Sequence, residues 1–347
     1  MFKSKRHFPA EWHPQSGVML TWPHSGTDWQ PWLNEVEQVY AELAFYITQV
    51  EKLLIVCNSD AHRAHIQTVL ANRKVSLKQI SFFIIPADDS WSRDHGPISI
   101  YKDNKPHIID FGFNAWGNKY EYHDDDLITQ RLYNQKAFNN IDIEASNLIL
   151  EGGSVDSDGQ GNILTTEHCL LSPQRNPQLD KNLISTELEK LLGIKNIFWL
   201  SHGIIVGDDT DSHIDMLARF CDPETIAYTS CDDPDDEHYQ ELTLMRAELE
   251  TLKTLSGQAY KLIPLPIPAA IYNQSGQRLP ASYANFLIIN GMVLVPVYND
   301  ANDEIAIMRL QKCFKDRKVI AIDCRALINQ YGSLHCISMQ LPEGVLN

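Results

Sequence analysis

The sequence predicts an α/β protein that is built as one domain from about five repeated ββαβ-type units. Two observations predict this architecture. Four polar turns, each between two β-rich runs, recur at intervals of roughly 60 residues, a period typical of propeller-like or solenoid repeats. A helical pattern follows each hairpin, and a short apolar strand follows most of these helices. No linker rich in Pro, Gly or Ser interrupts the 347 residues, so a single domain over 1–347 is favoured over two.

The N-terminal part is expected to alternate apolar strands with helices. Short apolar runs predict the strands, and a helical period of apolar residues predicts the segments between them. The predicted strands are residues 17–22, 52–57 and 82–87, and the predicted helices are about residues 33–49 and 60–72.

Four hairpins are predicted after this part, each a pair of β-rich runs around a polar turn. They cover residues 99–111, 153–167, 216–230 and 282–298. The fourth turns at Asn290-Gly291, the strongest short signal for a hairpin. Helical patterns are predicted at about residues 125–135, 179–192, 236–255 and 302–312, and apolar strands at 196–200, 260–265 and 318–323. The third helix has the clearest pattern, with Asp235 or Asp236 as its expected N-cap.

The composition excludes several classes of protein. With 44% hydrophobic and 21% charged residues, the chain has the composition of a soluble globular protein. No window is as long and apolar as a membrane-spanning helix, and the start lacks the apolar run of a secretory signal. A formal charge of −16 argues against a nucleic-acid-binding protein, which needs a positive surface. The seven cysteines include no CxxC pair, so reduced thiols and a cytoplasmic location are expected.

Two motifs in the first half of the chain carry acids where a core does not need them. The stretch "DDSWSRDHGP" (88–97) contains Trp91, Arg93 and Asp94 ahead of Gly-Pro, and alone it reads as a loop with a local Arg93–Asp94 pair. The stretch "NLILEGGSV" (147–155) is an apolar strand that ends in Glu151 and two glycines. This pattern suggests a position where something approaches the backbone closely, and a hairpin bend is the alternative.

The stretch "GDDTDSHIDMLARF" (207–220) carries a histidine and an acid among apolar residues. If residues 212–218 form a strand, His213 and Asp215 project from one face. A metal site is one alternative, because His-x-Asp can supply two ligands, but no HExxH or paired-Cys spacing supplies the others. A structural His–Asp pair is a second alternative.

The stretch "YGSLHCISMQLP" (331–342) reads as a short buried strand near the end of the chain. His335 and Cys336 are neighbours, so on a strand they would point to opposite faces. A reactive Cys336 therefore needs a partner from elsewhere in the chain, and His213 is the candidate. Together the four motifs supply one thiol, one histidine and three carboxylates, all expected at strand ends in successive repeats.

These residues together resemble the agmatine deiminase and bacterial-type peptidylarginine deiminase family, within the guanidine-modifying superfamily. The resemblance implies a five-bladed α/β propeller with pseudo-fivefold symmetry, its active site on the axis and its last strand beside the first unit. The matching stretches span nearly the whole chain in the family's order: "GVMLTWP", "DDSWSRDHGP", "FNAWG", "LEGGSVDSDGQGNILTTEHCLLSPQRNPQL", "DDTDSHIDMLARF", "SYANFLIINGMVLVPVYND" and "LHCISMQ".

The family's roles carry over residue by residue. The resemblance implies that Cys336 is the nucleophile and His213 the acid/base. It implies that Asp94 and Asp215 bind the guanidinium group, and that Glu151 orients the histidine and contacts the substrate. Trp91 and Trp116 resemble the aromatic walls of the pocket. The implied reaction needs no metal or organic cofactor.

The implied activity is hydrolysis of agmatine to N-carbamoylputrescine and ammonia, a step of polyamine biosynthesis, with a small cationic guanidino substrate as partner. Free arginine, peptidyl-arginine and amidino transfer are alternatives, and a catalytically silent guanidine-binding protein is an alternative from another class. The sequence leaves oligomeric state open, and a homo-oligomer is compatible with it. Three departures from the family bear on the substrate: Ser212 and Ser333 stand at positions usually occupied by glycine, and the segment 268–280 is short.

Overall fold

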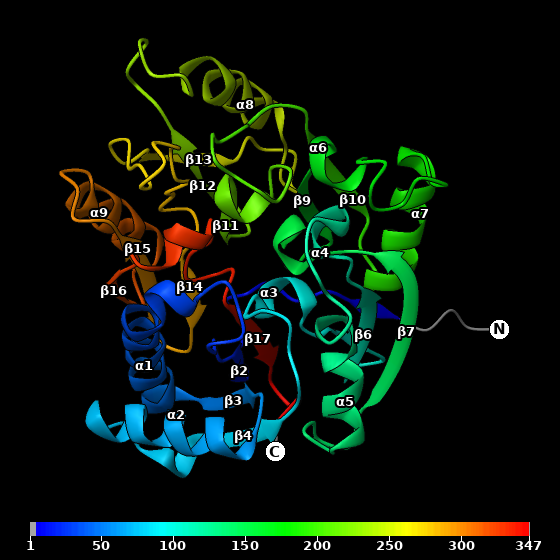
Figure 1. Ribbon diagram of the computed structural model, residues 1–347. Coiled ribbons are helices and arrows are strands. Elements are labelled where there is room, and N and C mark those ends of the chain that lie inside the picture. The colour runs from blue at the N-terminus through cyan, green and yellow to red at the C-terminus, as the bar shows by residue number, and fades with distance from the viewer. Residues whose placement is uncertain (1–4, 347) are drawn as a thin grey trace. The chain divides into compact units, whose positions relative to one another are not determined.

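The computed structural model describes residues 5–346, which form a mixed α/β fold with five separate sheets of three or four strands (Figure 1). Within these residues, no helix combines the length and the apolar character needed to span a membrane. The described chain divides into two compact units. The first contains residues 5–6, His13–Gly152 and 336–346, and the second contains His7–Trp12 and Gly153–His335. The predicted single catalytic domain stays a prediction.

The first sheet of the first unit has the order β17-β2-β3-β4 (Figure 1). Its parallel strands alternate with helices, because parallel neighbours need a crossover connection. Strand β17, near the end of the chain, pairs antiparallel with β2. The elements are β2 (Gln15–Thr21), η1 (Gln30–Trp32), α1 (Leu33–Val50), β3 (Lys52–Cys57), α2 (Asp60–Asn72), η2 (Leu77–Gln79), β4 (Ile80–Ile84) and β17 (Ser338–Pro342).

The second sheet of the first unit has the order β1-β5-β6-β7. The hairpin between β5 and β6 turns at Asp103-Asn104, where both φ values are positive, as a tight two-residue turn requires. Strand β7 then runs parallel to β6 after a helical crossover. The elements are β1 (Arg6–His7), α3 (Ser92–His95), β5 (Ile98–Lys102), β6 (Lys105–Gly112), α4 (Ala115–Asn118), η3 (Asp125–Leu127), α5 (Ile128–Asn134) and β7 (Asp142–Ile149).

The second unit contains three sheets, and each repeats the ββαβ pattern that the sequence predicts. In each sheet an antiparallel hairpin is followed by a helix and by a third strand parallel to the second. The first consists of η4 (Gly152–Ser154, at the start), β8 (Asp156–Ser157), β9 (Asn162–Thr166), α6 (Glu167–Leu170), α7 (Lys181–Leu192) and β10 (Asn196–Leu200). The second consists of η5 (Ile214–Met216), β11 (Ala218–Asp222), β12 (Thr225–Ser230), α8 (Tyr239–Thr251) and β13 (Lys261–Pro266). The third consists of β14 (Leu287–Ile289), β15 (Met292–Val297), α9 (Asp303–Cys313), β16 (Lys318–Asp323) and η6 (Leu327–Gln330).

Local signals predict most of these elements well. The four predicted hairpins are confirmed, and α2, β3, β10 and β16 have the predicted bounds. The predicted N-cap of the third helix is wrong, because α8 begins at Tyr239 with His238 before it. Asp236 accepts a hydrogen bond from the N–H of His238 at 2.9 Å and another from the guanidinium of Arg278 at 2.9 Å. Its carboxylate therefore stabilises the approach to α8 and does not cap the helix.

Candidate active site

Cys336 lies in a turn, so the predicted strand across His335 and Cys336 is wrong. Residues 334–337 form this turn, and β17 begins two residues after the cysteine. Cys336 is 5% exposed. Its carbonyl oxygen accepts a hydrogen bond from the N–H of Arg93 at 3.1 Å. The guanidinium of Arg93 donates further along the same segment, to Oε1 of Gln340 and to Sδ of Met339. The segment around Cys336 thus anchors the short helix α3, which carries Asp94.

Asp94 is buried beside an aromatic side chain that the sequence also predicted. Nε1 of Trp116 donates a hydrogen bond to Oδ2 of Asp94 at 3.0 Å. The turn that holds Trp116, α4, is left-handed, with φ of 48°, 55°, 96° and 63° at its four successive residues. A left-handed conformation costs an L-residue about 1–2 kcal/mol. The side chain of Asn114 stabilises the turn by accepting a hydrogen bond from the N–H of Gly117 at 3.0 Å. The strained backbone of this turn places the indole N–H of Trp116 against Asp94.

Trp91 belongs to the same group of side chains. Its ring lies edge-on to that of Trp116, with centroids 6.5 Å apart. Its Nε1 donates to Oδ2 of Asp89 at 3.0 Å, and the N–H of Asp89 donates in turn to the buried carboxylate of Asp125. Burial raises the pKa of Asp89 to about 6, against the hydrogen bonds from Ser90 and Trp91, which lower it. Asp89 was not singled out as a site residue from the sequence, although it lies in the "DDSWSRDHGP" motif.

Glu151 follows β7 and is fully buried. The residue after it explains the glycine pair of the motif. A Cβ atom added to Gly152 would lie 2.2 Å from the carbonyl oxygen of Arg93, a distance that real Cβ atoms do not show. The predicted close approach to the backbone is therefore confirmed at Gly152, and the approaching group is the backbone of α3. The first unit brings Trp91, Asp94, Trp116, Glu151 and Cys336 to the surroundings of this one short helix.

His213 and Asp215 belong to the second unit, and the strand predicted over 212–218 is wrong. Residues 214–216 form the 3₁₀ helix η5, and strand β11 begins only at Ala218. The loop before it is shaped by Asp208, whose carboxylate accepts the N–H of Ser212 at 2.6 Å and the hydroxyl of Thr210 at 2.7 Å. This loop passes through a positive φ of 67° at Ser212, which a strand does not tolerate. The sequence identified the two residues but not the backbone that presents them.

His213 is fully buried and has a thiol near its ring. A ring nitrogen of His213 and the sulfur of Cys169 lie within 4.8 Å of each other. Thr166 fixes the two segments together, since its hydroxyl donates to the carbonyl of Ser212 at 2.7 Å and accepts the N–H of Cys169 at 3.3 Å. A thiolate and an imidazole are both zinc ligands, and a tetrahedral site would need further donors around them. We assign this pair no metal.

Asp215 is fully buried and contacts a histidine that sequence reasoning set aside. Nδ1 of His335 lies 2.8 Å from Oδ2 of Asp215. Burial raises the pKa of Asp215, but the hydrogen bond and charge of His335, with smaller contributions from His213 and Arg219, outweigh burial and lower it below the ordinary value. Asp215 is therefore a carboxylate near neutral pH. The only signal for His335 in the sequence was its position next to Cys336.

Comparison with known protein families gives evidence that is independent of the residues around α3 and around His213. A family model described as Porphyromonas-type peptidyl-arginine deiminase matches residues 7–342. This chain belongs to that family. Among relatives of the family, an agmatine deiminase from Medicago truncatula is 31% identical over 97% of this chain and 96% of its own length.

Solved structures of deiminases share the fold. A structure from Porphyromonas gingivalis, provisionally named an arginine deiminase, is 45% identical, covers 99% of this chain and 100% of its own, and has a TM-score of 0.92. An agmatine deiminase from C. jejuni, solved with its substrate bound, is 38% identical, covers 99% of this chain and 98% of its own, and has a TM-score of 0.92. The mixed α/β fold with several small sheets is thus the fold of these deiminases.

The three features that we took from the sequence as departures from the family pattern have different structural settings. Ser212 adopts a left-handed backbone conformation that favours glycine, whereas Ser333 is buried, does not share this positive φ and accepts a hydrogen bond from Tyr298 at 3.4 Å. The segment 268–280 packs on the loop that leads to His213. A Cβ atom at Gly207 in that loop would lie 2.2 Å from the carbonyl oxygen of Arg278.

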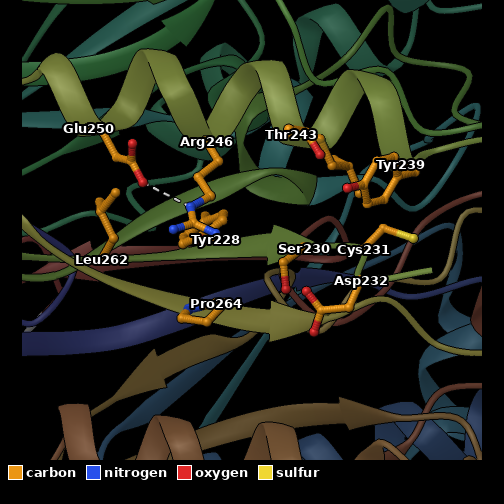
Figure 2. Close-up of a pocket in the computed structure, with 11 residues that line it drawn as sticks. Tyr228, Ser230, Cys231, Asp232, Tyr239, Thr243, Arg246, Glu250, Leu262 and Pro264 are labelled. Atoms are coloured by element: carbon orange, nitrogen blue, oxygen red, sulfur yellow. Dashed lines mark hydrogen bonds and ion pairs between the residues drawn. The ribbon is translucent and has the colours of Figure 1, made fainter. Parts of the chain in front are cut away.

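The second unit also contains a cavity that none of the predicted site residues lines. It has a volume of about 290 Å³ and lies between α8 and strands β12 and β13. Figure 2 shows Arg246 and Glu250 of α8 above Tyr228 and Pro264 of the strands, with a hydrogen bond of 2.9 Å between the first two. The residues that line it belong to α8, to strands β12 and β13 and to the segment directly after β12, and we assign it no role in the chemistry below.

Proposed function

We propose that this protein is a hydrolase that deiminates a guanidino compound with a cysteine nucleophile. We further propose that agmatine is the substrate, giving N-carbamoylputrescine and ammonia. Membership of the deiminase family supports the reaction class, and the names of the Medicago truncatula and C. jejuni relatives support agmatine. The observation that carries the proposal is a buried carboxylate, Asp94, fixed by an indole N–H on a helix that is itself hydrogen-bonded to Cys336.

The chemistry requires carboxylates around the reacting carbon. A guanidinium carbon is a weak electrophile, because its positive charge is delocalised over the nitrogens. Carboxylates that grip the group in a fork hold the carbon in line with the attacking atom. We assign this grip to Asp94 and Asp215, the walls of the pocket to Trp91 and Trp116, and the orientation of His213 to Glu151.

The reaction then proceeds in two halves. The thiolate of Cys336 attacks the guanidinium carbon, and protonated His213 gives its proton to the departing nitrogen, so that ammonia leaves. An S-alkylthiouronium remains on the cysteine. His213 next takes a proton from water, which attacks the same carbon, and cleavage of the C–S bond releases the ureido product and the thiol.

A relative supports the role of the cysteine. The C. jejuni agmatine deiminase with bound substrate is a variant in which one cysteine is replaced by serine. A serine hydroxyl is a weaker nucleophile than a thiolate, so this replacement would allow a substrate to persist in the site. We assign the nucleophile of this chain to Cys336.

Several further expectations belong to this proposal. The mechanism uses no metal and no organic cofactor, and the partner is a small cationic guanidino compound; we expect no nucleic-acid or membrane partner. We propose that the five sheets are the blades of one α/β propeller with pseudo-fivefold symmetry, and that residues 1–347 act as a single catalytic domain in the cytoplasm. Homo-oligomerisation is compatible with all of these.

The substrate has a second candidate, since free arginine or peptidyl-arginine would use the same chemistry. The description of the family and the name of the Porphyromonas gingivalis structure favour it. Amidino transfer would use an amine in place of water. A catalytically silent guanidine-binding protein would need the carboxylates but not the thiol.

Ammonia release from the purified protein tests the proposed reaction and distinguishes the candidate substrates. Agmatine, free arginine and an arginine-containing peptide are assayed in parallel without any acceptor amine, and Cys336→Ala is the control. We expect release from agmatine that the substitution abolishes. Release only from arginine or peptide would keep the mechanism and change the substrate. No release from any of the three by the folded protein would favour the silent binder, and full activity of Cys336→Ala would remove Cys336 as the nucleophile.

A further inference from the structure

His335, the residue before Cys336, lies between two carboxylates of the second unit. Its Nδ1 is 2.8 Å from Oδ2 of Asp215, and its Nε2 is 2.7 Å from Oε1 of Glu11. The side chain of His335 is 1% exposed, as is that of Asp215. A neutral imidazole has one donor nitrogen and one acceptor nitrogen, whereas an imidazolium donates from both. Two flanking carboxylates therefore match the imidazolium.

The second carboxylate, Glu11, is itself held by a cation. The guanidinium of Arg219, which has no exposed surface, donates to Oε2 of Glu11 through one nitrogen and to Oδ2 of Asp156 through Nε at 3.1 Å. The result is a row of five ion-paired groups: Asp215, His335, Glu11, Arg219 and Asp156. The side chain of Glu11 is 16% exposed and the other four are buried. Burial raises the pKa of Asp156 to about 7, against the charge of Arg219, which lowers it. Buried charges are tolerated when each is paired in this way.

A neutral His335 would require one of its carboxyl partners to carry the proton. Arg219 lies against Glu11 and favours its ionised form, and although burial raises the pKa of Asp215, the charge of Arg219 acts in the opposite direction there too. The titratable and charged groups that act on this pair include Glu11 from the N-terminal segment, Arg219 from β11 and His213 beside η5. The proton is therefore best placed on the imidazole.

The backbone of His335 is fixed as firmly as its ring. Its N–H donates to Asn285, at 2.9 Å to the side-chain Oδ1 and at 3.2 Å to the carbonyl oxygen. The next residue along the chain is Cys336. The ring of His335 thus contacts Asp215, while the backbone of the same residue fixes the start of the turn that contains Cys336.

We propose that His335 is a positioning residue that acts as a permanently charged imidazolium, holding Asp215 ionised and oriented for a guanidinium group. Glu11, which is paired with Arg219, keeps His335 protonated. This assignment to Asp215 rests on the proposed function, whereas the protonation state of His335 does not. The imidazolium takes no part in proton transfer, because its two protons are both committed to carboxylates.

Another buried histidine of the second unit provides a matched control. Nδ1 of His238 lies 2.7 Å from Oδ1 of Asp236, but its Nε2 accepts the N–H of Val206 at 2.9 Å. An accepting nitrogen carries no proton, so His238 is neutral. Burial lowers its pKa accordingly, against the effect of Asp236.

The protonation state is tested first, because that test needs no activity. The wild-type protein is labelled with ¹⁵N in its 13 histidines, and the ring nitrogens are recorded at pH 8, well above the ordinary histidine pKa of about 6.5. We expect one histidine with both nitrogens protonated, whose signals vanish in His335→Gln or, if that variant does not fold, change in Glu11→Gln. Neutral rings for all histidines at pH 8 would overturn the proposal.

The role toward Asp215 is tested by the pH profile of kcat/KM. Without the imidazolium, the burial of Asp215 raises its pKa, so the acid limb of His335→Gln moves to higher pH. The maximal kcat/KM falls by about 100-fold, the loss that a misplacement of about 1 Å can cause. His238→Gln leaves the acid limb in place. An unchanged limb in His335→Gln would remove the positioning role. Absence of all guanidine activity in the wild-type protein would instead overturn the proposed function and leave the NMR result standing.

Discussion

At the scale of single residues, Ser212 and Ser333, which stand where the sequence led us to expect glycine, differ in their backbone. Ser212 has a φ of 67°, in the region that costs an L-residue about 1–2 kcal/mol, while Ser333 does not have a positive φ. We predict that Ser212→Gly raises the free energy of unfolding by up to about 1 kcal/mol, because the relief of strain exceeds the entropy that glycine loses on folding. Ser333→Gly should lower it by about 0.5–1 kcal/mol. Urea unfolding measures both, and shifts of the same sign would contradict the assignment.

Trp116 provides a second prediction at this scale, because its indole N–H is a donor to a carboxylate. Hydrogen bonds to charged groups contribute about 1.5–3 kcal/mol, so we expect Trp116→Phe to lower kcat/KM by about 10–100-fold while keeping an aromatic wall. Trp91→Phe is the comparison, since the indole of Trp91 donates to Asp89 and not to Asp94. Steady-state kinetics at saturating and limiting substrate give kcat and kcat/KM for Trp116→Phe and for Trp91→Phe. Equal effects of the two substitutions would show that the bond to Asp94 is not the important one.

Asp89, which accepts a hydrogen bond from Trp91, should make the stability of the folded protein depend on pH. Its pKa is raised from 3.8 to about 6 in the folded protein by burial, so the folded state holds its proton more tightly than the unfolded chain does. The contribution of this group to stability is therefore fully present below about pH 4 and is lost as the pH rises through about 6. We predict that Asp89→Asn flattens the dependence of the unfolding free energy on pH between these values. Urea unfolding at pH 4, 5, 6 and 7 gives the difference curve, and parallel curves would exclude Asp89 as the titrating group.

At the scale of elements, the contact between Gly152 and α3 decides where Asp94 lies. A methyl group at Gly152 would meet the carbonyl of Arg93 at 2.2 Å, so Gly152→Ala must move either the loop after β7 or the helix. We predict that the variant folds with reduced stability and loses about 100-fold in kcat/KM, as a displacement of about 1 Å can cause. Gly26→Ala is the control, because a Cβ there would meet only the ring of His24, at 3.0 Å. Wild-type kinetics in Gly152→Ala would show that α3 tolerates the shift.

The elements also show which parts of the structure local sequence signals can predict. The repeated hairpins and helices follow from turn residues and apolar periodicity, which act over a few positions, and they are confirmed. The two predicted strands that are wrong, over 212–218 and across Cys336, are segments shaped by side-chain or long-range contacts that apolar periodicity does not reveal. The first is bent by the nearby carboxylate of Asp208 and is bonded by the distant hydroxyl of Thr166. The second is bonded by the distant N–H of Arg93, which donates to the carbonyl of Cys336.

Some residues of the candidate site could likewise be predicted from the sequence, and others could not. Residue types in unusual places identified His213 and Asp215 from the sequence, because an acid and a histidine in an apolar run are conspicuous. The role of His335 could not be predicted, since its partner Glu11 lies more than 300 positions away and carries no motif of its own. Periodicity contains no information about such pairs.

At the scale of the whole molecule, neither compact unit is made from one continuous stretch of chain. The chain passes between the units at residues 6–7, 12–13, 152–153 and 335–336. The short N-terminal segment that belongs to the second unit is held there by the ion pair of Glu11 with the fully buried Arg219. The last strand, β17, belongs to the first unit and pairs with β2. Neither unit can therefore be cut from the chain as a single fragment.

This interleaving predicts that the two units unfold together. Unfolding of the first unit releases β17 and the turn that precedes it. Unfolding of the second unit releases residues 7–12. Each unit therefore contains a chain segment whose neighbouring residues are fixed in the other unit. We expect urea unfolding curves from tryptophan fluorescence and from far-UV circular dichroism to coincide, as a two-state transition requires. Glu11→Gln should shift both curves to lower urea by the same amount. Two separate midpoints, or a shift confined to one probe, would show that the units are independent domains.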